Sequence, residues 1–395
     1  MTELTCLVTV HGIGFQQPPD DERGRPGYAD ALHTALRGPL EGRLGEDPER
    51  SGGGAVYVAS ECETSPEKGL ARLGKDLVAT GDVAHVALVY SPSEPLDPRL
   101  GSVLDATARA AFSLNHYTNV LGALRLLGSD AWAAIHPGPG AHAGETTLRP
   151  RTDLAVEHRH GRVAELVRSL HGHAAADGTP PTSFGILQAL ADDVAAYVCR
   201  NDLRERVRGF VDEALYRLAR RDDVTRIVVN AHSQGTVLCW DVLCRTRTFD
   251  VRHRAEHGTT LGAFVTAGSP IRKYVDMFAW GERVGRMASL EPPFTWRNFW
   301  DPRDPVADPL DPPASWKPGT PADVPFERDP QRPGLLVAID PETGTPRHVT
   351  VTDRQIDNVV NSTGGGLRAH DYWNNTAQFV MPLAKLVRDA APVLA

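Results

Sequence analysis

Short apolar runs alternate along the chain with longer segments in which apolar residues recur every three or four positions. The short runs predict six or seven strands, several of them apolar throughout, as strands buried on both faces of a sheet must be. These strands are 4–10, 55–59, 83–90, 225–230, 262–266, 294–300 and, with a weaker pattern, 348–352. The longer segments predict helices at 28–40, 68–79, 186–220, 235–245 and 371–388. This alternation indicates an α/β fold with a mostly parallel central sheet and helices on both faces.

Two stretches interrupt the alternation. Residues 91–183 hold two or three apolar helical segments and then a passage rich in glycine, proline and histidine. We expect them to form a helical cap or lid, inserted into a core made of residues 1–90 and 184–395. Residues 302–346 contain twelve prolines, which remove backbone donors and fix φ. We expect an ordered surface excursion within the core there, not a separate domain.

Composition and charge narrow the class of protein. Hydrophobic residues make up 41% of the chain, enough to bury a core, and the net charge of −8 argues against nucleic acid or an anionic membrane as the main partner. The five cysteines lack CxxC spacing, so neither a disulfide framework nor a structural zinc site is expected. The first residues do not resemble an export signal, and no apolar run reaches 18 residues. We therefore expect a cytoplasmic protein without a transmembrane segment.

The strongest chemical signal lies where a buried strand runs directly into a helix. Ala231-His232-Ser233-Gln234-Gly235 occupies this junction. So sharp a turn holds its serine in a strained conformation and needs small residues two positions before and after it, which Ala231 and Gly235 provide. The positive end of the helix dipole adds to the site. We predict that Ser233 is a nucleophile; the alternative is a helix-capping serine in an inert turn.

A glycine-rich turn follows the first predicted strand. It reads His11-Gly12-Ile13-Gly14, and its glycines let the backbone approach a ligand closely. In a serine hydrolase, the N–H groups of Ile13 and Gln234 would stabilise the oxyanion of a tetrahedral intermediate. A plain turn is the alternative. A phosphate-binding loop is excluded because neither GxGxxG nor a GK[ST] ending follows.

Such a nucleophile requires an acid and then a histidine farther along the chain, on loops at the carboxyl edge of the sheet. His370 follows a glycine-rich loop and precedes a predicted helix, so we expect it to be the base. Asp304 and Asp301 follow the strand 294–300 and are the candidate acids. We favour Asp304 for its place in the loop and expect Asp301 to cap or orient that loop. Asp304 would accept the Nδ1–H of His370 while Nε2 deprotonates Ser233.

These motifs, in this order, resemble those of the α/β-hydrolases, in particular the serine esterase and lipase branch. The resemblance covers residues 4–90 and 186–388, through HGIG, AHSQG, the Asp-Pro-Val loop and the late histidine. It implies the α/β-hydrolase fold with a helical cap insertion. Two features depart from the family pattern. Ala231 replaces the first glycine of GxSxG, as in some bacterial lipases, and the strand before HGIG begins at residue 4, so we expect the family's first two antiparallel strands to be absent.

Other residues are weaker candidates for substrate or metal binding. Gly268-Ser269-Pro270 is similar to a turn of lipase-like hydrolases, and Tyr274 and Phe278 after it are candidates for an acyl-binding pocket or for the core. Seven histidines fall in residues 91–183, two pairs of them spaced HxH. No carboxylate or thiol completes a ligand set around these pairs, so we expect solvated histidines and neither a metal nor a cofactor.

The sequence as a whole predicts a serine hydrolase that cleaves a carboxylic ester of a small-molecule or lipid-like substrate through an acyl-enzyme. A thioesterase or an acyltransferase would use the same residues. Apolar segments in residues 101–135 leave open the deacylation of a lipid at a membrane. The alternative from another class is a non-catalytic α/β-hydrolase scaffold that binds a ligand or a protein partner.

Overall fold

A computed structural model of the chain describes residues 3–12, 18–19, 26–60, 67–90, 197, 201–243, 248–249, 256–271, 295–302, 304, 306–307, 309–310, 337–339, 346–348, 351–362 and 368–389. The chain divides into two compact units. The first comprises Met1–Pro92, Arg208–Arg272 and Val284–Ala395, and the second comprises Ser93–Val207 and Lys273–Arg283. Of the second unit, the structure describes residues 197 and 201–207. The predicted cap at 91–183 therefore lies outside the described residues.

A seven-stranded, all-parallel sheet forms the centre of the first unit, in the order β2-β3-β1-β4-β5-β6-β9. Its central strands are buried along almost their whole length, which explains why they read as continuous apolar runs. The strands are β1 (Leu4–Val10), β2 (Val56–Ala59), β3 (Val83–Val89), β4 (Val224–His232), β5 (Thr260–Ala267), β6 (Thr295–Trp300) and β9 (Val351–Gln355). The predicted α/β class with a parallel sheet is confirmed.

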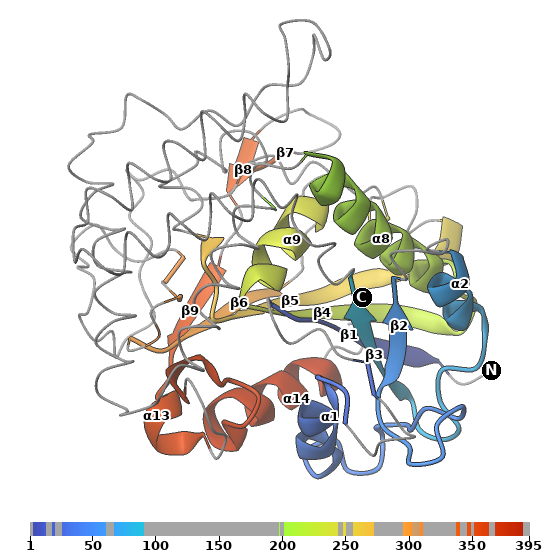
Figure 1. Ribbon diagram of the computed structural model, residues 1–395, viewed down its shortest axis with the longest axis horizontal. Coiled ribbons are helices and arrows are strands. Elements are labelled where there is room, and N and C mark those ends of the chain that lie inside the picture. The colour runs from blue at the N-terminus through green and yellow to red at the C-terminus, as the bar shows by residue number, and fades with distance from the viewer. Residues whose placement is uncertain are drawn as a thin grey trace, which may run out of the picture. The chain divides into compact units, whose positions relative to one another are not determined.

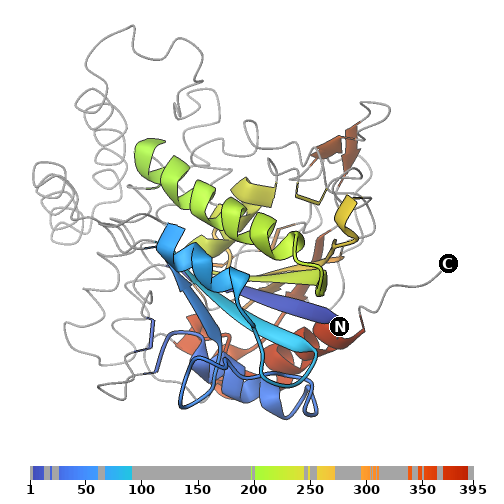
Figure 2. The same cartoon turned by 90° about the vertical axis from the view of Figure 1, so that its right-hand side faces the viewer.

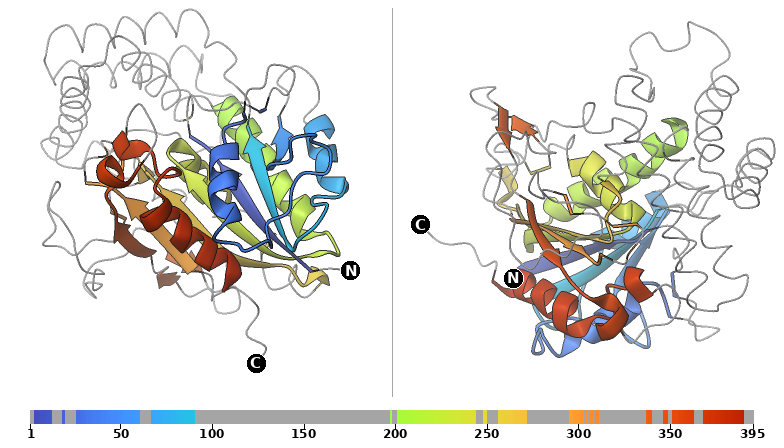
Figure 3. Two further views of the ribbon diagram at one scale, coloured as in Figure 1. Left: turned by 90° about the horizontal axis from the view of Figure 1, so that it is seen from below. Right: turned by 90° about the vertical axis from the view of Figure 1, so that its left-hand side faces the viewer.

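Helices cover both faces of this sheet (Figures 1 and 2). One face carries α8 (Asn201–Ala219) and α9 (Gln234–Leu243), and the short α2 (Glu67–Leu70) lies on the same side. The other face carries α1 (Asp30–Arg37) and α14 (Met381–Arg388), which lie in front of the strands in the left panel of Figure 3 and beneath them in the right panel. The remaining short helices are η2 (Ala71–Gly74), α13 (Asn358–Asn361), η4 (Arg368–His370) and the π-turn η5 (Thr376–Val380).

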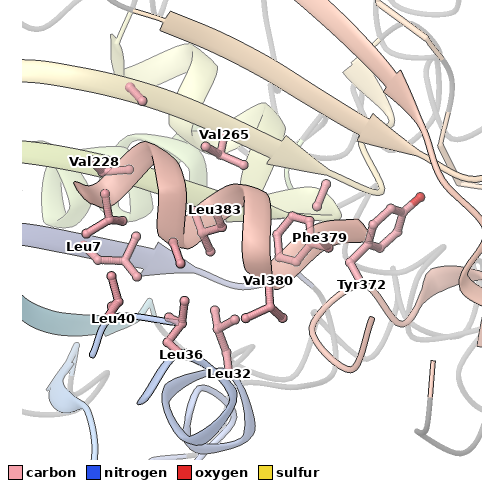
Figure 4. Packing of buried hydrophobic residues seen from close by; sticks show 14 of the residues in the cluster. Leu7, Leu32, Leu36, Leu40, Val228, Val265, Tyr372, Phe379, Val380 and Leu383 are labelled. Atoms are coloured by element: carbon pink, nitrogen blue, oxygen red, sulfur yellow. The ribbon is translucent and has the colours of Figure 1, made fainter. Parts of the chain in front are cut away.

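The apolar core under α1 and α14 shows how helical spacing produces this layering (Figure 4). Leu32, Leu36 and Leu40 recur every four positions and face Leu7 of β1, and all four are fully buried. Residues of η5 and α14 pack onto the same cluster beside Val228 and Val265 of the sheet. Burying a leucine side chain contributes about 1.5–3 kcal/mol, so these stripes fix both helices against the strands.

Three of the predicted elements have boundaries whose differences have a clear physical cause. The predicted helix 68–79 ends at Gly74, since Gly69 and Gly74 weaken a helix and Lys75 is already extended. The predicted strand 348–352 is displaced, because β8 (Pro346–His348) pairs instead with β7 (Val337–Ile339) in a separate antiparallel sheet and β9 starts at Val351. The predicted helix 371–388 starts at Thr376, where the Asn375 side chain accepts the Gln378 N–H as an N-cap.

The first described residues of the proline-rich range 302–346 are packed into the core. Val306, Ala307 and Leu310 are buried, and the Leu310 N–H donates to Asp353 Oδ1 of β9 at 2.9 Å. This contact ties the loop after β6 to the neighbouring strand. None of the helices that the structure describes is both long and apolar enough to cross a membrane.

Candidate active site

The order of the strands reverses between β1 and β4. The chain leaves β1 toward β2 and β3 on one side of the sheet, and it leaves β4 toward β5, β6 and β9 on the other. In open α/β sheets, ligands bind outside the carboxyl ends of the strands at such a switch point. Here those ends are followed by His11 and Gly12 after β1 and by Ser233 after β4. The topology therefore brings two separate sequence motifs to the place where a ligand is expected.

Ser233 occupies the junction between β4 and α9 in a strained conformation. Its φ is +55°, in the left-handed region, which costs a non-glycine residue about 1–2 kcal/mol. Hydrogen bonds hold it there: its N–H donates to Ala267 O of β5 at 2.9 Å, and its carbonyl accepts from the Thr236 N–H at 3.0 Å and hydroxyl at 2.7 Å. The serine side chain thus projects at the switch point, as the sequence predicts for a nucleophile.

Close packing of the first loop against this junction explains the small residues around Ser233. A Cβ at Gly235 would overlap the carbonyl oxygen of His11, so only glycine lets α9 start this close to the end of β1. A Cβ at Gly12 would overlap the Ser233 side chain, 2.8 Å from its Oγ and 3.2 Å from the Gln234 nitrogen. The backbone after β1 therefore lies directly beside the serine hydroxyl and the Gln234 N–H. The described residues end here at Gly12, and Ile13 and Gly14 lie outside them.

A partly buried His370 and a buried Asp304 form a pair at the same edge of the sheet. Nδ1 of His370 donates to Asp304 Oδ2 at 2.8 Å, from loops that follow β9 and β6. Asp304 Oδ2 also accepts from the Tyr372 hydroxyl at 2.8 Å, and its Oδ1 accepts from the Val306 N–H at 2.9 Å. Burial alone would raise the pKa of Asp304, but the charge and hydrogen bond of His370 and these two donors lower it below its ordinary value. The carboxylate therefore stays ionised and oriented.

Asp301, the other candidate acid, has a different partner. Its Oδ2 accepts the Asn358 N–H at 2.6 Å, at the start of α13. The Asn358 side chain in turn donates to Ala369 O at 2.8 Å, one residue before His370. Asp301 thus supports the loop that carries the histidine, whereas the sequence leads us to expect it to cap or orient the loop that carries Asp304.

Gly268 places the His370 imidazole beside the nucleophile's strand. This glycine directly follows Ala267, whose carbonyl accepts the Ser233 N–H. Its φ is +62°, and a Cβ there would lie 2.7 Å from Cε1 and 2.9 Å from Nδ1 of His370. The imidazole therefore lies over the carboxyl end of β5, next to the strand that ends at Ser233.

His232 joins the nucleophile strand to the histidine loop directly. Its Nε2–H donates to the carbonyl of His370 at 3.0 Å, and the two rings are 4.6 Å apart between centroids. Burial, together with the nearby His370, lowers the pKa of His232 to about 3. This neutral histidine can therefore act as a fixed donor and is a poor proton acceptor at neutral pH.

His11 is a second buried, neutral histidine in this region. Its ring stacks on Tyr90 with centroids 4.6 Å apart, its Nδ1 bonds to the Gly12 carbonyl, and its own carbonyl accepts from the Tyr90 hydroxyl at 2.9 Å. Burial lowers the pKa of His11 to about 4, although the bond to Gly12 opposes this shift. These contacts fix the backbone just before the predicted oxyanion loop.

The sequence motifs did not assign a role to three residues of this site: His232, Tyr372 and Gly268. The first two flank predicted site residues within two positions, which is the signal that could have found them. The predicted pocket residues Tyr274 and Phe278, and the HxH histidines, lie outside the described residues. Among the residues that the structure does describe, no group of three or more histidines, cysteines and carboxylates could hold a metal ion.

In comparisons with known proteins, no protein-family model, no curated protein and no solved structure matches this chain. A functional assignment therefore depends on the geometry of the site and on the motifs within it.

Proposed function

We propose that this protein is a serine hydrolase with the α/β-hydrolase fold, and that it cleaves carboxylic esters with Ser233, His370 and Asp304. The observation that carries the proposal is the 2.8 Å His370–Asp304 pair at the same sheet edge as a serine held at φ +55°. An inert turn has no need of a strained serine at the same sheet edge as an oriented imidazole–carboxylate pair. The parallel sheet, with the serine, the aspartate and the histidine on the segments that follow β4, β6 and β9, supports this proposal.

In the proposed reaction, Ser233 Oγ attacks the ester carbonyl carbon while His370 Nε2 accepts the hydroxyl proton. The oxyanion that forms accepts the Gln234 N–H and, as the sequence predicts, the N–H of Ile13. His370 then gives its proton to the departing alcohol, which leaves an acyl-enzyme. Water attacks this ester with His370 again as the base, and the carboxylic acid is released with Ser233 regenerated.

Two roles follow for the surroundings of the triad. Asp304 accepts the Nδ1–H, which fixes the tautomer that exposes Nε2 and stabilises the imidazolium during the reaction. His232 holds the main chain of His370 and, being neutral, adds no positive charge beside the imidazolium. The site is therefore arranged for one proton to move between serine, base and leaving group.

A panel of p-nitrophenyl esters of graded chain length tests the proposal. We expect turnover of at least one ester by the wild type, and a loss of about 10³-fold or more in kcat for Ser233→Ala and for His370→Ala. Thr248→Ala, at a buried hydroxyl that is not among the site residues, is the control and should retain activity. Thioesters and alcohol acceptors added to the panel separate a thioesterase or acyltransferase from an esterase. Hydrolysis that survives intact in Ser233→Ala contradicts the proposal.

A further inference from the structure

The hydroxyl of Tyr372 lies between the two aspartates of the loop after β6. It donates to Asp304 Oδ2 at 2.8 Å and accepts the backbone N–H of Asp301 at 3.0 Å. The oxygen that it contacts on Asp304 is the one that accepts the His370 Nδ1–H. Asp304 Oδ2 thus accepts two hydrogen bonds, and the two donors, His370 and Tyr372, are only two positions apart in the chain.

We propose that Tyr372 is a positioning residue of the triad, which orients the Asp304 carboxylate and sets how strongly it draws the proton of His370. This inference rests on the proposed function and adds a fourth residue to it.

The packing of the ring supports this role. Tyr372 is fully buried, and its ring meets Phe379 at a centroid distance of 6.1 Å. Figure 4 shows the ring at the end of the apolar cluster with its hydroxyl pointing away from that cluster. A Cβ at Gly268 would lie 2.9 Å from Tyr372 Cε2, so the sheet closes the other side of the ring. The hydroxyl therefore has little freedom to leave Asp304.

Because Tyr372 and His370 share one oxygen of Asp304, the direction in which Tyr372 affects the protonation of His370 can be worked out. A donor on Asp304 Oδ2 disperses its negative charge and so weakens its attraction for the imidazolium. Among the described residues, the titratable groups facing His370 are Asp304, Tyr372 and His232, and His232 stays neutral near neutral pH. Burial, and the nearby Asp304 and Asp301 charges, raise the pKa of Tyr372, so its hydroxyl keeps its proton. Loss of this donor should make His370 easier to protonate.

Tyr372→Phe removes the donor and keeps the ring. We expect the midpoint of the His370 titration, followed by NMR of its ring protons, to rise by about half a pH unit or more. We also expect kcat/KM to fall about tenfold at the alkaline plateau, with its acid limb displaced upward by the same amount. Tyr57→Phe is the matched control, because its hydroxyl accepts the Ala29 N–H at 2.9 Å and is remote from Asp304. Tyr57→Phe should change neither the midpoint of the NMR titration nor the midpoint of the acid limb of kcat/KM.

Two further variants distinguish positioning from a merely structural role. In an Asp304→Asn background, Tyr372→Phe should cause no further rise, because the carboxylate through which it acts is gone. Replacement of Tyr372 by 3-fluorotyrosine keeps the shape, makes a stronger donor and should lower the midpoint; it also serves if Tyr372→Phe does not fold. An unchanged midpoint in the variants that fold overturns the inference, as does a rise that persists without Asp304. The expected NMR shift without any Ser233-dependent hydrolysis would instead overturn the proposed function alone.

Discussion

Replacement of Gly268 by alanine tests whether the position of the His370 imidazole controls activity. Gly268 has a φ of +62°, and a methyl group there would lie 2.7 Å from Cε1 of His370. Carbon atoms in ordinary contact are about 3.5–4.0 Å apart, so the imidazole must move by about 1 Å. The backbone cannot retreat freely, because the Gly268 N–H donates to Phe299 O of β6. The ring should therefore leave its 2.8 Å hydrogen bond with Asp304.

Gly258→Ala is a control that carries the same cost of a positive φ but brings the new methyl group into contact with no other residue. Gly258 has a φ of +76°, and a Cβ there would meet nothing within 4 Å. Alanine in the left-handed region costs about 1–2 kcal/mol, so both variants should lose at least that much free energy of unfolding, and Gly268→Ala should lose more because of its contact with His370. A 1 Å misplacement of a catalytic group can cost about 100-fold in rate, so only Gly268→Ala should lose kcat to that extent.

The assay compares kcat and KM on the best ester with urea unfolding for the wild type and both variants. The expected pattern is a lower free energy of unfolding in both variants, with the larger loss in Gly268→Ala. Gly258→Ala should keep full activity, and kcat should fall about 100-fold in Gly268→Ala. If Gly268→Ala hydrolyses the ester as fast as Gly258→Ala does, the imidazole over Gly268 is not the working base, and the reasoning is refuted.

Three other predictions follow from the same contacts. Asp304→Asn should lower kcat by about 10⁴-fold, because the carboxylate that orients His370 is lost. Asp301→Asn should mainly lower the free energy of unfolding, because it weakens the hydrogen bond that supports the histidine loop. Equal losses of kcat in the two variants would contradict this difference in roles. Ser233→Gly should unfold with a free energy about 1–2 kcal/mol higher than Ser233→Ala, since glycine adopts φ +55° without strain; equal urea midpoints would show that no strain is stored there. Burial lowers the pKa of His11 to about 4 and that of His232 to about 3 in the folded protein, against about 6.5 when unfolded. Their contribution to the free energy of unfolding is therefore fully present above pH ~6.5 and is lost as the pH falls through about 4 for His11 and about 3 for His232. Urea unfolding at several pH values should show this loss, and replacement of either histidine by glutamine should flatten it.

Part of the fold could be predicted because burial on both faces leaves a direct trace in the sequence. Strands such as β1 and β4 are continuous apolar runs, and α1 shows its buried stripe at every fourth residue. The strained turn at Ser233 is also visible, because close approach of strand and helix requires small residues at Ala231 and Gly235. That an aspartate after β6 would pair with His370 follows from chain order and a parallel sheet.

Other features depend on contacts between distant positions, which local patterns do not encode. The hydrogen bond from His232 to the His370 carbonyl spans 138 positions, and the one from Tyr372 to Asp304 spans 68. The start of the last helical segment depends on the Asn375 side chain, which competes with a helix that the apolar spacing alone would begin earlier. The choice between Asp301 and Asp304 is likewise made by tertiary contacts.

Mass spectrometry of the protein after reaction with a fluorophosphonate probe tests the central claim most directly. Such a probe reacts with a serine hydroxyl that a neighbouring base activates. We expect one phosphonyl adduct on the peptide that contains Ser233, a much slower reaction in His370→Ala, and none at this site in Ser233→Ala. An unmodified Ser233, under conditions in which a known serine hydrolase in the same mixture is fully labelled, would contradict the assignment of Ser233 as an activated nucleophile.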